Sequence, residues 1–343
     1  MQYLVTGGAG FVGTAVVEAL LRAGATTFSI DLIDYPPQVA DYLASLPGDL
    51  RFLCGDARFE DLARFTAGGE GDIVVIHCAA HTPNPEGEKS APRNTLIDNL
   101  DATLALLDFA RTERVARTIY VSSGGVYGDL RNRGDLVDGK VDEDVTAARP
   151  KSLYAVAKHA GELAALRYRD LYKLPIHIAR VGLVFGPWER LTGARQIVSA
   201  PHQIVSLARV GTPVVLERDS CRGWTSSRDM AAALVGLAAA RQLDADLYNV
   251  ATPHRWPLSL FASHLGRRLP NMRFEFAGER PTAGEGAEPG RRRGGHGRLR
   301  HAGRRGGVLG RVDQLRRLAA GGRPRVADHR KRAAAVPHEF DGM

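Results

Sequence analysis

A glycine-rich segment close to the N-terminus constrains the fold of this chain more than any other feature. It reads TGGAGFVG over residues 6–13, between a predicted strand and a predicted helix. Glycines there let the backbone turn sharply and approach a pyrophosphate, which the N–H groups at the start of the helix then meet. Gly8, Gly10 and Gly13 fit the pattern G-x-G-x-x-G, whereas Gly7, Gly10 and Gly13 fit G-x-x-G-x-x-G. The segment therefore predicts a dinucleotide site at the first strand-to-helix turn.

The rest of the chain alternates strand and helix patterns, which is typical of a parallel sheet covered by helices. Strands are predicted at residues 2–6, 26–31, 50–54, 73–77, 118–122, 176–181 and 247–250, and helices at 11–23, 95–111, 152–172 and 230–240. The run at 73–77 is almost continuously apolar, as expected of a strand buried on both faces. We predict an α/β fold with a Rossmann-type, doubly wound parallel sheet and a smaller C-terminal substrate lobe.

Two carboxylates follow predicted strands and bear on the choice of cofactor. Asp31 ends the second strand, where it would accept hydrogen bonds from ribose hydroxyls and repel a 2′-phosphate, which favours NAD over NADP. Asp34 is a nearby competitor for this role. Asp56 follows the third strand, and it either hydrogen-bonds the adenine amine or caps the following helix.

Three residues form a candidate catalytic group. Tyr154 and Lys158 are four residues apart on a predicted helix, so their side chains share one face. A free tyrosine titrates near 10, and we expect the Lys158 ammonium and an oxidised nicotinamide to lower that pKa. The phenolate would then accept the proton of a substrate hydroxyl while a hydride leaves the carbon that bears this hydroxyl. Ser123, at the end of the fifth strand, would hydrogen-bond the reacting oxygen.

With these residues assembled, the sequence resembles the extended short-chain dehydrogenase/reductase family, in its NAD-dependent epimerase/dehydratase group. The motifs that carry the resemblance run in order over residues 1–265: TGGAGFVG at 6–13, HCAA at 77–80, Asn99 with Thr103, SSGGVYG at 122–128, YAVAK at 154–158, ARVGLVFGP at 179–187 and CRGWTSSRDMA at 221–231.

The resemblance implies a seven-stranded Rossmann domain with bound NAD, a C-terminal lobe that selects the substrate, and homodimers formed through the two long helices. It matches Ser123, Tyr154 and Lys158 to the catalytic triad, and Arg222 to an arginine that holds a nucleotide-sugar diphosphate. The cofactor-binding residues that it implies are Gly7, Gly10, Phe11, Val12, Gly13, Asp31, Asp56, Ala57, Ala79, Ala80, Asn99, Tyr154 and Lys158.

Departures from the family pattern bear on the reaction. Gly124 and Gly125 stand where dehydratases and decarboxylases of the family carry acidic residues, so elimination is disfavoured. Leu183 stands three residues before Gly186-Pro187, where an Asn is usual, and leucine donates no hydrogen bond to a sugar or diphosphate. The usual Leu-Gly-Trp-x-Pro ending has no clear counterpart after Glu279.

The formal net charge of +8 is concentrated in one segment. Residues 280–335 hold sixteen Lys or Arg against four Asp or Glu, so the rest of the chain is mildly acidic. We expect residues 1–185 to form the NAD-binding domain, with a strand returning at 247–250, residues 186–279 the substrate-binding lobe, and 280–343 an Arg/Gly-rich tail. Three interpretations of the tail stay open: a disordered solvated segment, a shifted reading frame, or an RNA- or phosphate-binding segment. Without interleaved aromatic residues, nucleic acid is an unexpected partner.

Three functions remain open from the sequence. The first is a UDP-hexose-like nucleotide-sugar epimerase, favoured by Arg222. The second is a dehydrogenase or reductase of a free sugar, sugar acid or related hydroxy compound, favoured by Leu183. The third is a non-catalytic NAD-binding sensor or scaffold, against which the intact Ser123, Tyr154 and Lys158 argue.

The location of the protein is also predicted from the sequence. Cys54, Cys78 and Cys221 are odd in number and lack metal-ligand spacing, so we expect no metal and a reducing cytoplasm. A signal peptide and a membrane-spanning segment are not expected, because the chain begins directly in a strand pattern and no apolar run reaches the length of a membrane span.

Overall fold

The seven predicted strands form one parallel sheet in the computed structural model of the chain, which describes residues 1–343 except 68–71, 114, 217–218, 270 and 278–343. Its strands are β1 (Gln2–Thr6), β2 (Thr26–Asp31), β3 (Asp49–Cys54), β4 (Ile73–His77), β5 (Arg117–Ser123), β6 (Ile176–Val181) and β11 (Leu247–Val250). Their order across the sheet is β11-β6-β5-β4-β1-β2-β3, and every neighbouring pair is parallel. The fold class predicted from the sequence is confirmed.

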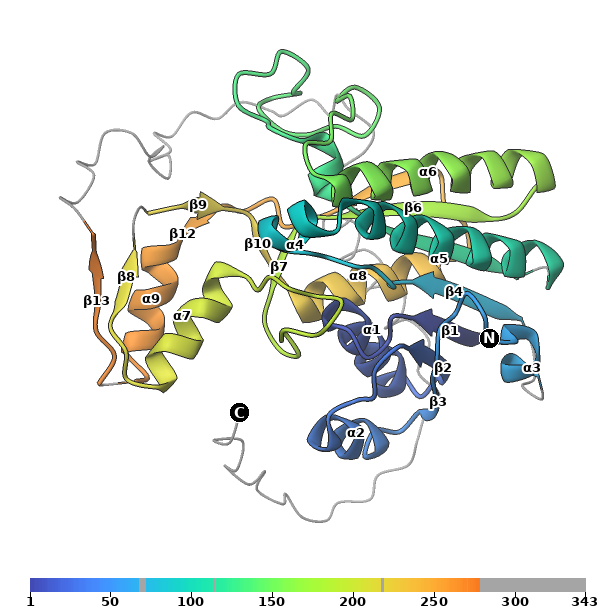
Figure 1. Cartoon of the computed structure of the whole chain (residues 1–343), viewed down its shortest axis with the longest axis horizontal. Helices are drawn as coiled ribbons and strands as arrows, with labels where there is room; N and C mark the ends of the chain where they lie inside the picture. The colour runs from blue at the N-terminus through green and yellow to red at the C-terminus, as the bar shows by residue number, and fades with distance from the viewer. Residues whose placement is uncertain (68–71, 114, 217–218, 270, 278–343) are drawn as a thin grey trace, which may run out of the picture.

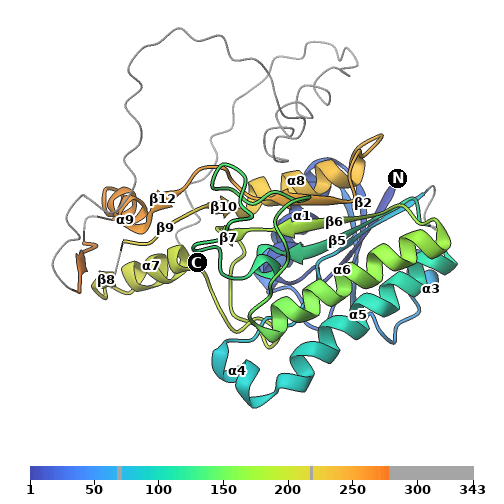
Figure 2. The same ribbon diagram turned by 90° about the horizontal axis from the view of Figure 1, so that it is seen from above.

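Helices cover both faces of this sheet, because side chains along each strand point alternately to one face and the other. Tyr3 and Val5 of β1 share a core with α1, α2 and α8, whereas Leu4 packs with α3 and α5 on the opposite face. Figure 2 shows α8 on one side of the sheet and the long helices α5 and α6 together on the other. The helices are α1 (Phe11–Arg22), α2 (Pro37–Ala44), α3 (Leu62–Thr66), α5 (Pro92–Thr112), α6 (Leu153–Tyr172) and α8 (Ser227–Ala239).

The order of the strands fixes where a ligand can bind. The chain leaves β1 toward β2 and β3, then crosses over to β4 on the other side of β1. The connections after β1 and β4 therefore diverge, and they open a crevice at the carboxyl ends of these two strands. The glycine-rich turn, the short helix α4 (Pro85–Ser90) and the 3-10 turn Gly124–Tyr127 all follow strands at this edge.

A smaller lobe lies beside this edge, at the left of Figure 1. It is assembled from two stretches of chain separated by α8 and β11. Its elements are β7 (Leu183–Phe185), α7 (Ala200–Arg209), β8 (Val214–Leu216), β9 (Cys221–Arg222), β10 (Trp224–Ser226), β12 (Trp256–Pro257), α9 (Leu258–Gly266) and β13 (Phe274–Phe276). It has its own apolar core, built on Ile204, Val214, Leu216, Leu258 and Ala262.

Most of the predicted element boundaries agree with the structure to within one residue, and the exceptions have local causes. Helix α5 begins at Pro92 rather than at residue 95, because proline is well tolerated in the first helical turn. Helix α8 begins at Ser227 rather than at residue 230, because the Ser226 hydroxyl accepts a hydrogen bond from the Asp229 N–H at 3.1 Å. The short elements of the lobe were not predicted at all.

Three further expectations concern the C-terminal tail, a membrane-spanning helix and a metal site. The Arg/Gly-rich tail at 280–343 lies outside the described residues. Within the part of the chain that is described, no helix is long and apolar enough to span a membrane, and no group of three or more His, Cys, Asp or Glu side chains is placed to hold a metal ion.

Candidate active site

The glycine-rich turn is packed so closely that its glycines cannot be replaced without movement. Gly7 has a φ of 67°, and a Cβ added to it would lie 2.6 Å from the backbone N and Cα atoms of Ala79. A Cβ on Gly13 would lie 2.0 Å from the Gly7 carbonyl oxygen. No described side chain caps the start of α1, and its first turn carries no acidic residue. The backbone N–H groups at Phe11 and the residues after it therefore suit an anionic pyrophosphate.

Asp31 lies at the rim of this turn, as the sequence predicts. A Cβ on Gly10 would lie 3.9 Å from its carboxylate. Burial raises the pKa of the Asp31 carboxyl, and hydrogen bonds from the backbone N–H groups of Ile33, Ala9, Leu32 and Gly10 oppose that rise. The competitor Asp34 is exposed and instead lines a surface pocket beneath α2. Of the two carboxylates, Asp31 is the one placed beside the glycines.

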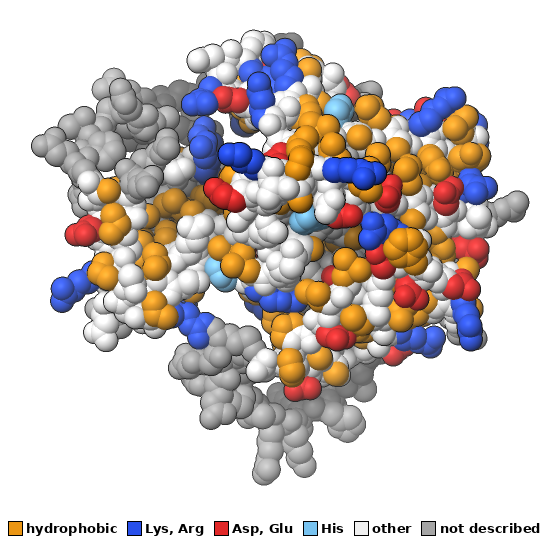
Figure 3. Space-filling model, viewed as in Figure 1, with side chains coloured by type: hydrophobic (Ala, Val, Ile, Leu, Met, Phe, Trp, Pro, Cys, Tyr) orange, Lys and Arg blue, Asp and Glu red, His pale blue; other side chains and the backbone are white. Residues whose placement is uncertain are grey.

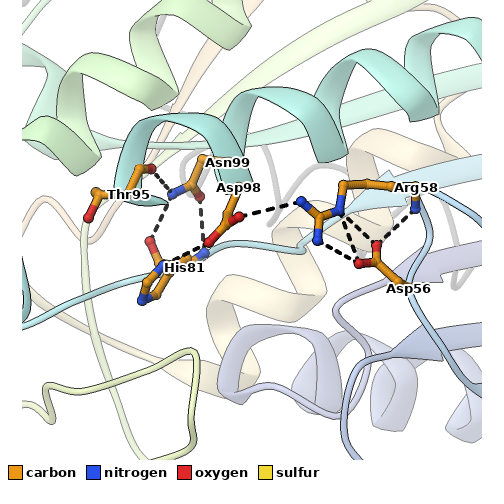
Figure 4. Close-up of polar contacts among 6 residues, drawn as sticks. All are labelled: Asp56, Arg58, His81, Thr95, Asp98 and Asn99. Atoms are coloured by element: carbon orange, nitrogen blue, oxygen red, sulfur yellow. Dashed lines mark hydrogen bonds and ion pairs between the residues drawn. The ribbon is translucent and has the colours of Figure 1, made fainter. Parts of the chain in front are cut away.

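Asp56 is already paired within the protein. Figure 4 shows the Arg58 guanidinium gripping its carboxylate, with Nε at 3.0 Å from each oxygen and Nη2 at 2.6 Å from Oδ2. The Arg58 N–H adds a further bond at 3.0 Å, and these contacts lower the pKa of Asp56. The alternative that Asp56 caps the next helix is wrong, because Asp61 caps α3 by accepting a hydrogen bond from the Arg64 N–H. Asp56 closes a turn instead.

The amide of Asn99 ties α5 to the connection that follows β4. Its Nδ2 donates to the carbonyl oxygens of His81 at 2.9 Å and Thr95 at 2.8 Å, and its Oδ1 accepts from the His81 N–H at 3.1 Å. Asp98 extends this network by pairing with Arg58 at 3.4 Å and with His81 at 3.4 Å. Asn99 thus positions the backbone next to Ala79 and Ala80 on the crevice side of β4.

Tyr154 meets Ser123 and Thr82 at the mouth of the crevice. The phenol is half-buried near the start of α6, whose N-terminus is capped by the Ser152 hydroxyl. Burial raises the pKa of Tyr154, whereas hydrogen bonding with Ser123, the positive charge of Arg195 and hydrogen bonding with Thr82 lower it. In the protein alone burial dominates, so the predicted lowering of this pKa is not met there. Ser123 and Tyr154 thus lie together at the site, and the hydrogen bond from Ser123 to the reacting oxygen stays a prediction.

Lys158 lies one helical turn further along α6 and is 2% exposed. Its Nζ is 4.7 Å from the centroid of the Tyr120 ring, which offers its negative face to the ammonium. Burial lowers the pKa of Lys158 to about 8, although the nearby Cys78 and Glu162 raise it. In the protein alone, the positive charge that lowers the pKa of the Tyr154 phenol comes from Arg195, a residue that the sequence did not suggest, and the same role for Lys158 stays a prediction.

A buried ion pair holds the inner part of α6 against the sheet. Glu162 accepts hydrogen bonds from Arg180 Nε at 2.8 Å and Nη2 at 2.7 Å, and from the Ser122 hydroxyl at 2.6 Å. Burial raises the pKa of Glu162, but these donors outweigh it and the net pKa is lowered. The ion pair with Arg180 therefore holds α6 against β6, and the hydrogen bond from Ser122, the neighbour of Ser123, holds α6 against β5.

The residues expected to govern the substrate lie in the smaller lobe and in the turn that follows β5. Arg222 is exposed in β9, where it pairs with Trp256 of β12. Leu183 is 47% exposed in β7, opposite Trp224 of β10. Gly124 lies in the 3-10 turn directly after Ser123.

Sequence reasoning missed the residues that reach the site from the connection between β7 and α7. Arg190 donates from Nη2 to the carbonyl oxygen of Ala9 in the glycine-rich turn. Burial lowers the pKa of Arg190, and the Asp31 carboxylate opposes this. Arg195 stacks over Phe11. The sequence signal for them is the pair of arginines in WERLTGAR at 188–195, but a local pattern does not reveal which distant segments these side chains contact.

The fold and this crevice define a Rossmann-type dinucleotide enzyme, and comparison with known proteins gives the family. The model of the NAD dependent epimerase/dehydratase family matches residues 3–251. The chain belongs to that family. The expected cofactor, NAD, and the expected class of enzyme are thereby confirmed at the level of the family.

Relatives carry several activities within this family. The chain is 31% identical over 196 residues to a dTDP-glucose 4,6-dehydratase of Streptomyces niveus, covering 55% of each chain. It is 30% identical over 239 residues to the low-salt glycan biosynthesis protein Agl12 of Haloferax volcanii, covering 68% of this chain and 72% of the relative. It is 30% identical over 201 residues to a UDP-glucose 4-epimerase of Mycolicibacterium smegmatis, covering 58% and 61%. The chain spans about half the length of several of the curated relatives it matches.

Solved structures give the same fold. The UDP-glucuronic acid 4-epimerase of Bacillus cereus in complex with NAD superimposes with a TM-score of 0.66 at 22% identity, covering 81% of this chain and 86% of that one. The epimerase Mth375 of Methanothermobacter thermautotrophicus gives a TM-score of 0.66 at 26% identity, covering 80% and 79%.

Proposed function

We propose that this protein is an NAD-dependent epimerase acting on a nucleotide sugar of the UDP-hexose kind. The observation that carries the proposal is the meeting of Tyr154 with Ser123 at the crevice, one helical turn from the buried Lys158. This group lies at the carboxyl edge of the sheet, on the same side as the glycine-rich turn. A protein that only bound the dinucleotide would not need a phenol held in this way.

The residues present fit the cofactor. We assign its binding to Gly7, Gly10, Phe11, Val12, Gly13, Asp31, Asp56, Ala57, Ala79, Ala80, Asn99, Tyr154 and Lys158. The tight packing of Gly7 and Gly13 and the uncapped start of α1 support the pyrophosphate position. Asp31 at the rim of the turn supports contact with a ribose that carries no 2′-phosphate. Because Arg58 holds both oxygens of Asp56, a contact with adenine would use their remaining lone pairs.

The protein's own groups supply the proton chemistry. Bound NAD would supply the acceptor, and later the donor, of a hydride at the sugar carbon. Tyr154 accepts the proton of the sugar hydroxyl at its phenol oxygen and later gives it back. Ser123 holds the same sugar oxygen by a hydrogen bond, and Lys158 supplies a buried positive charge on the inner side of the site.

Two features bear on which reaction this site runs. Gly124 follows Ser123 directly and Gly125 is next, so these positions offer no carboxylate to remove a proton from carbon. This favours epimerisation, or simple oxidation and reduction, over the dehydration catalysed by some relatives. Arg222 on the lobe is our candidate for the diphosphate of the substrate. Leu183 favours the second candidate function, a dehydrogenase or reductase of a free sugar or sugar acid, because its exposed side chain cannot hydrogen-bond a diphosphate.

One assay separates these functions. The protein is incubated with NAD and a panel of UDP-hexoses, UDP-hexuronic acids, free sugars and sugar acids, and both product isomers and NADH are measured. We expect isomerisation of a UDP-sugar without net NADH, whereas stoichiometric NADH with a free sugar would favour the second candidate. Tyr154→Phe should lose at least about 100-fold in turnover while still binding NAD. Tyr172→Phe, on the same helix and exposed, is the matched control.

The proposed enzyme acts as a homodimer joined through α5 and α6. Apolar side chains lie exposed on these helices, among them Ile97 at 39%, Val156 at 39%, Leu163 at 57% and Leu171 at 51%. Val156, Leu163 and Leu171 fall on one face of α6 by helical spacing. Figure 3 shows orange apolar side chains among charged ones over this part of the molecule. A second copy of the chain would cover them.

A further inference from the structure

The connection between β7 and α7, residues 186–199, is called the strap here. It leaves the lobe side of the sheet and brings Arg195 over the glycine-rich turn, with the guanidinium carbon 4.9 Å from the centroid of the Phe11 ring. Arg195 Nη2 also pairs with Glu189 Oε1 at 3.0 Å. Its Nε is buried and has no acceptor among the described residues. The Arg195 guanidinium therefore keeps one hydrogen-bond donor without an acceptor among the described residues, close to the proposed catalytic group.

The backbone of the strap is joined to the connection that follows β4. The Thr82 N–H donates to the Ala194 carbonyl at 2.7 Å, and the Gln196 N–H donates to the Thr82 carbonyl at 3.0 Å, which forms a parallel bridge between Thr82 and Arg195. Thr82 is also a hydrogen-bonding partner of the Tyr154 phenol. Arg195 is thus fixed directly beside a residue that touches the proposed proton acceptor.

Glu189 connects this arrangement to the lobe. Its side chain is fully buried, and it accepts hydrogen bonds from the Ser199 N–H and the Ser199 hydroxyl, each at 2.6 Å. The Ser199 hydroxyl in turn caps the start of α7 by accepting from the His202 N–H at 3.2 Å. One carboxylate therefore holds both Arg195 and the first turn of a lobe helix. A displacement of α7 would be transmitted to the guanidinium.

We propose that Arg195 is a positioning residue that stabilises the phenolate of Tyr154, and that Glu189 makes its position depend on the placement of the substrate lobe. This inference rests on the proposed role of Tyr154 as proton acceptor. The cation acts through space, because opposite charges favour the ionised form of a buried acid. Arg195 would favour ionisation of the Tyr154 phenol only when the lobe holds the strap in place.

The other charged and titratable groups around the phenol come from different elements. Lys158 lies on α6 itself, Tyr120 lies on β5, and His77 and Cys78 at the end of β4 face the Lys158 ammonium. Burial holds the pKa of Tyr120 high and lowers that of His77 to about 3, so neither changes charge near neutral pH. Arg195 and Lys158 are the two cations to be distinguished by experiment.

The experiment follows the ionisation of Tyr154 directly. The full chain is labelled with tyrosine carrying ¹³C at Cζ, and the Tyr154 signal is assigned by its loss in Tyr154→Phe. The titration is run with and without NAD, on wild type, Arg195→Met, Arg195→Lys, Glu189→Gln and Lys158→Met. Arg209→Met removes an exposed charge from α7 and is the matched control. NAD binding is measured separately by calorimetry.

We expect Arg195→Met to raise the titration midpoint of Tyr154 by about one pH unit, so that the phenol stays protonated where wild type is half ionised. Arg195→Lys should restore most of the shift, Glu189→Gln should give a smaller shift in the same direction, and Arg209→Met should give none. If Arg195→Met does not fold, the lysine and Glu189 variants decide the matter by the same signal.

An unchanged midpoint in Arg195→Met, together with a shift in Lys158→Met, would overturn the inference. Failure of wild type to bind NAD would instead count against the proposed function. The titration without NAD would still decide the role of Arg195, so the two failures are distinguishable.

Discussion

At the scale of single residues, Gly7 shows how a backbone requirement becomes a functional one. Its positive φ and the 2.6 Å approach to Ala79 leave no room for a side chain. Gly24 has a similar φ of 76°, but nothing lies within 4 Å of its Cβ position. Comparing substitutions at Gly7 and Gly24 therefore separates the effect of backbone strain from that of steric contact.

We predict that Gly7→Ala lowers NAD affinity at least about tenfold, because the turn must move away from Ala79 to admit a methyl group. Gly24→Ala should cost about 1 kcal/mol of stability from backbone strain alone and leave NAD affinity unchanged. Calorimetric titration with NAD and urea unfolding of both variants test this. Equal NAD affinities in the two variants would contradict the packing argument.

Lys158 predicts a pH dependence of stability. Burial places its pKa in the folded protein at about 8, below the value of 10.5 for a free lysine. Between pH 8 and pH 10.5, Lys158 is protonated in the unfolded chain but not in the folded protein. The free energy of unfolding therefore rises with pH over this range. Relative to Lys158→Met, wild type should gain about 2 kcal/mol between pH 8 and 9.5.

Urea unfolding at several pH values measures this difference. Lys151→Met, which removes an exposed lysine just before the same helix, should follow wild type at every pH. A flat difference between wild type and Lys158→Met over this range would mean that the ammonium is not buried as the structure has it.

At the scale of elements, the contact between α6 and β6 depends on the Glu162–Arg180 pair. We predict that Glu162→Gln lowers the free energy of unfolding by about 3 kcal/mol, because Arg180 is left buried without its counter-charge. The double variant with Arg180→Met should lose less than the single one, since no uncompensated charge remains. Denaturant unfolding measures both. A loss below about 1 kcal/mol in Glu162→Gln would show that the pair does not hold these elements together.

At the scale of the whole molecule, the exposed face of α5 and α6 predicts the assembly. Leu163→Glu should convert a dimer into monomers, because a charge would be buried at the centre of the face. Leu207→Glu, at a 37% exposed position on α7, should leave the assembly unchanged. Sedimentation velocity distinguishes the two species. A wild-type protein that sediments as a monomer would exclude this role for the two helices.

The sequence by itself determined the main sheet and half of the site. The strands at residues 26–31, 73–77 and 176–181 have the predicted ends, because apolar runs bounded by breakers are local signals. The turn at Gly7 and the face shared by Tyr154 and Lys158 were equally readable, because each depends on residues a few positions apart. These features need no knowledge of the rest of the chain.

Tertiary structure alone decided which charges meet at the site. Arg195 lies in the strap and Tyr154 in α6, and the bridge between the strap and Thr82 brings them together. Arg58 pairs with Asp56 across a turn that no sequence periodicity predicts. The lobe, too, joins stretches of chain on either side of α8 and β11. Local patterns record which face of an element is apolar, whereas contacts between distant segments depend on how the whole chain packs.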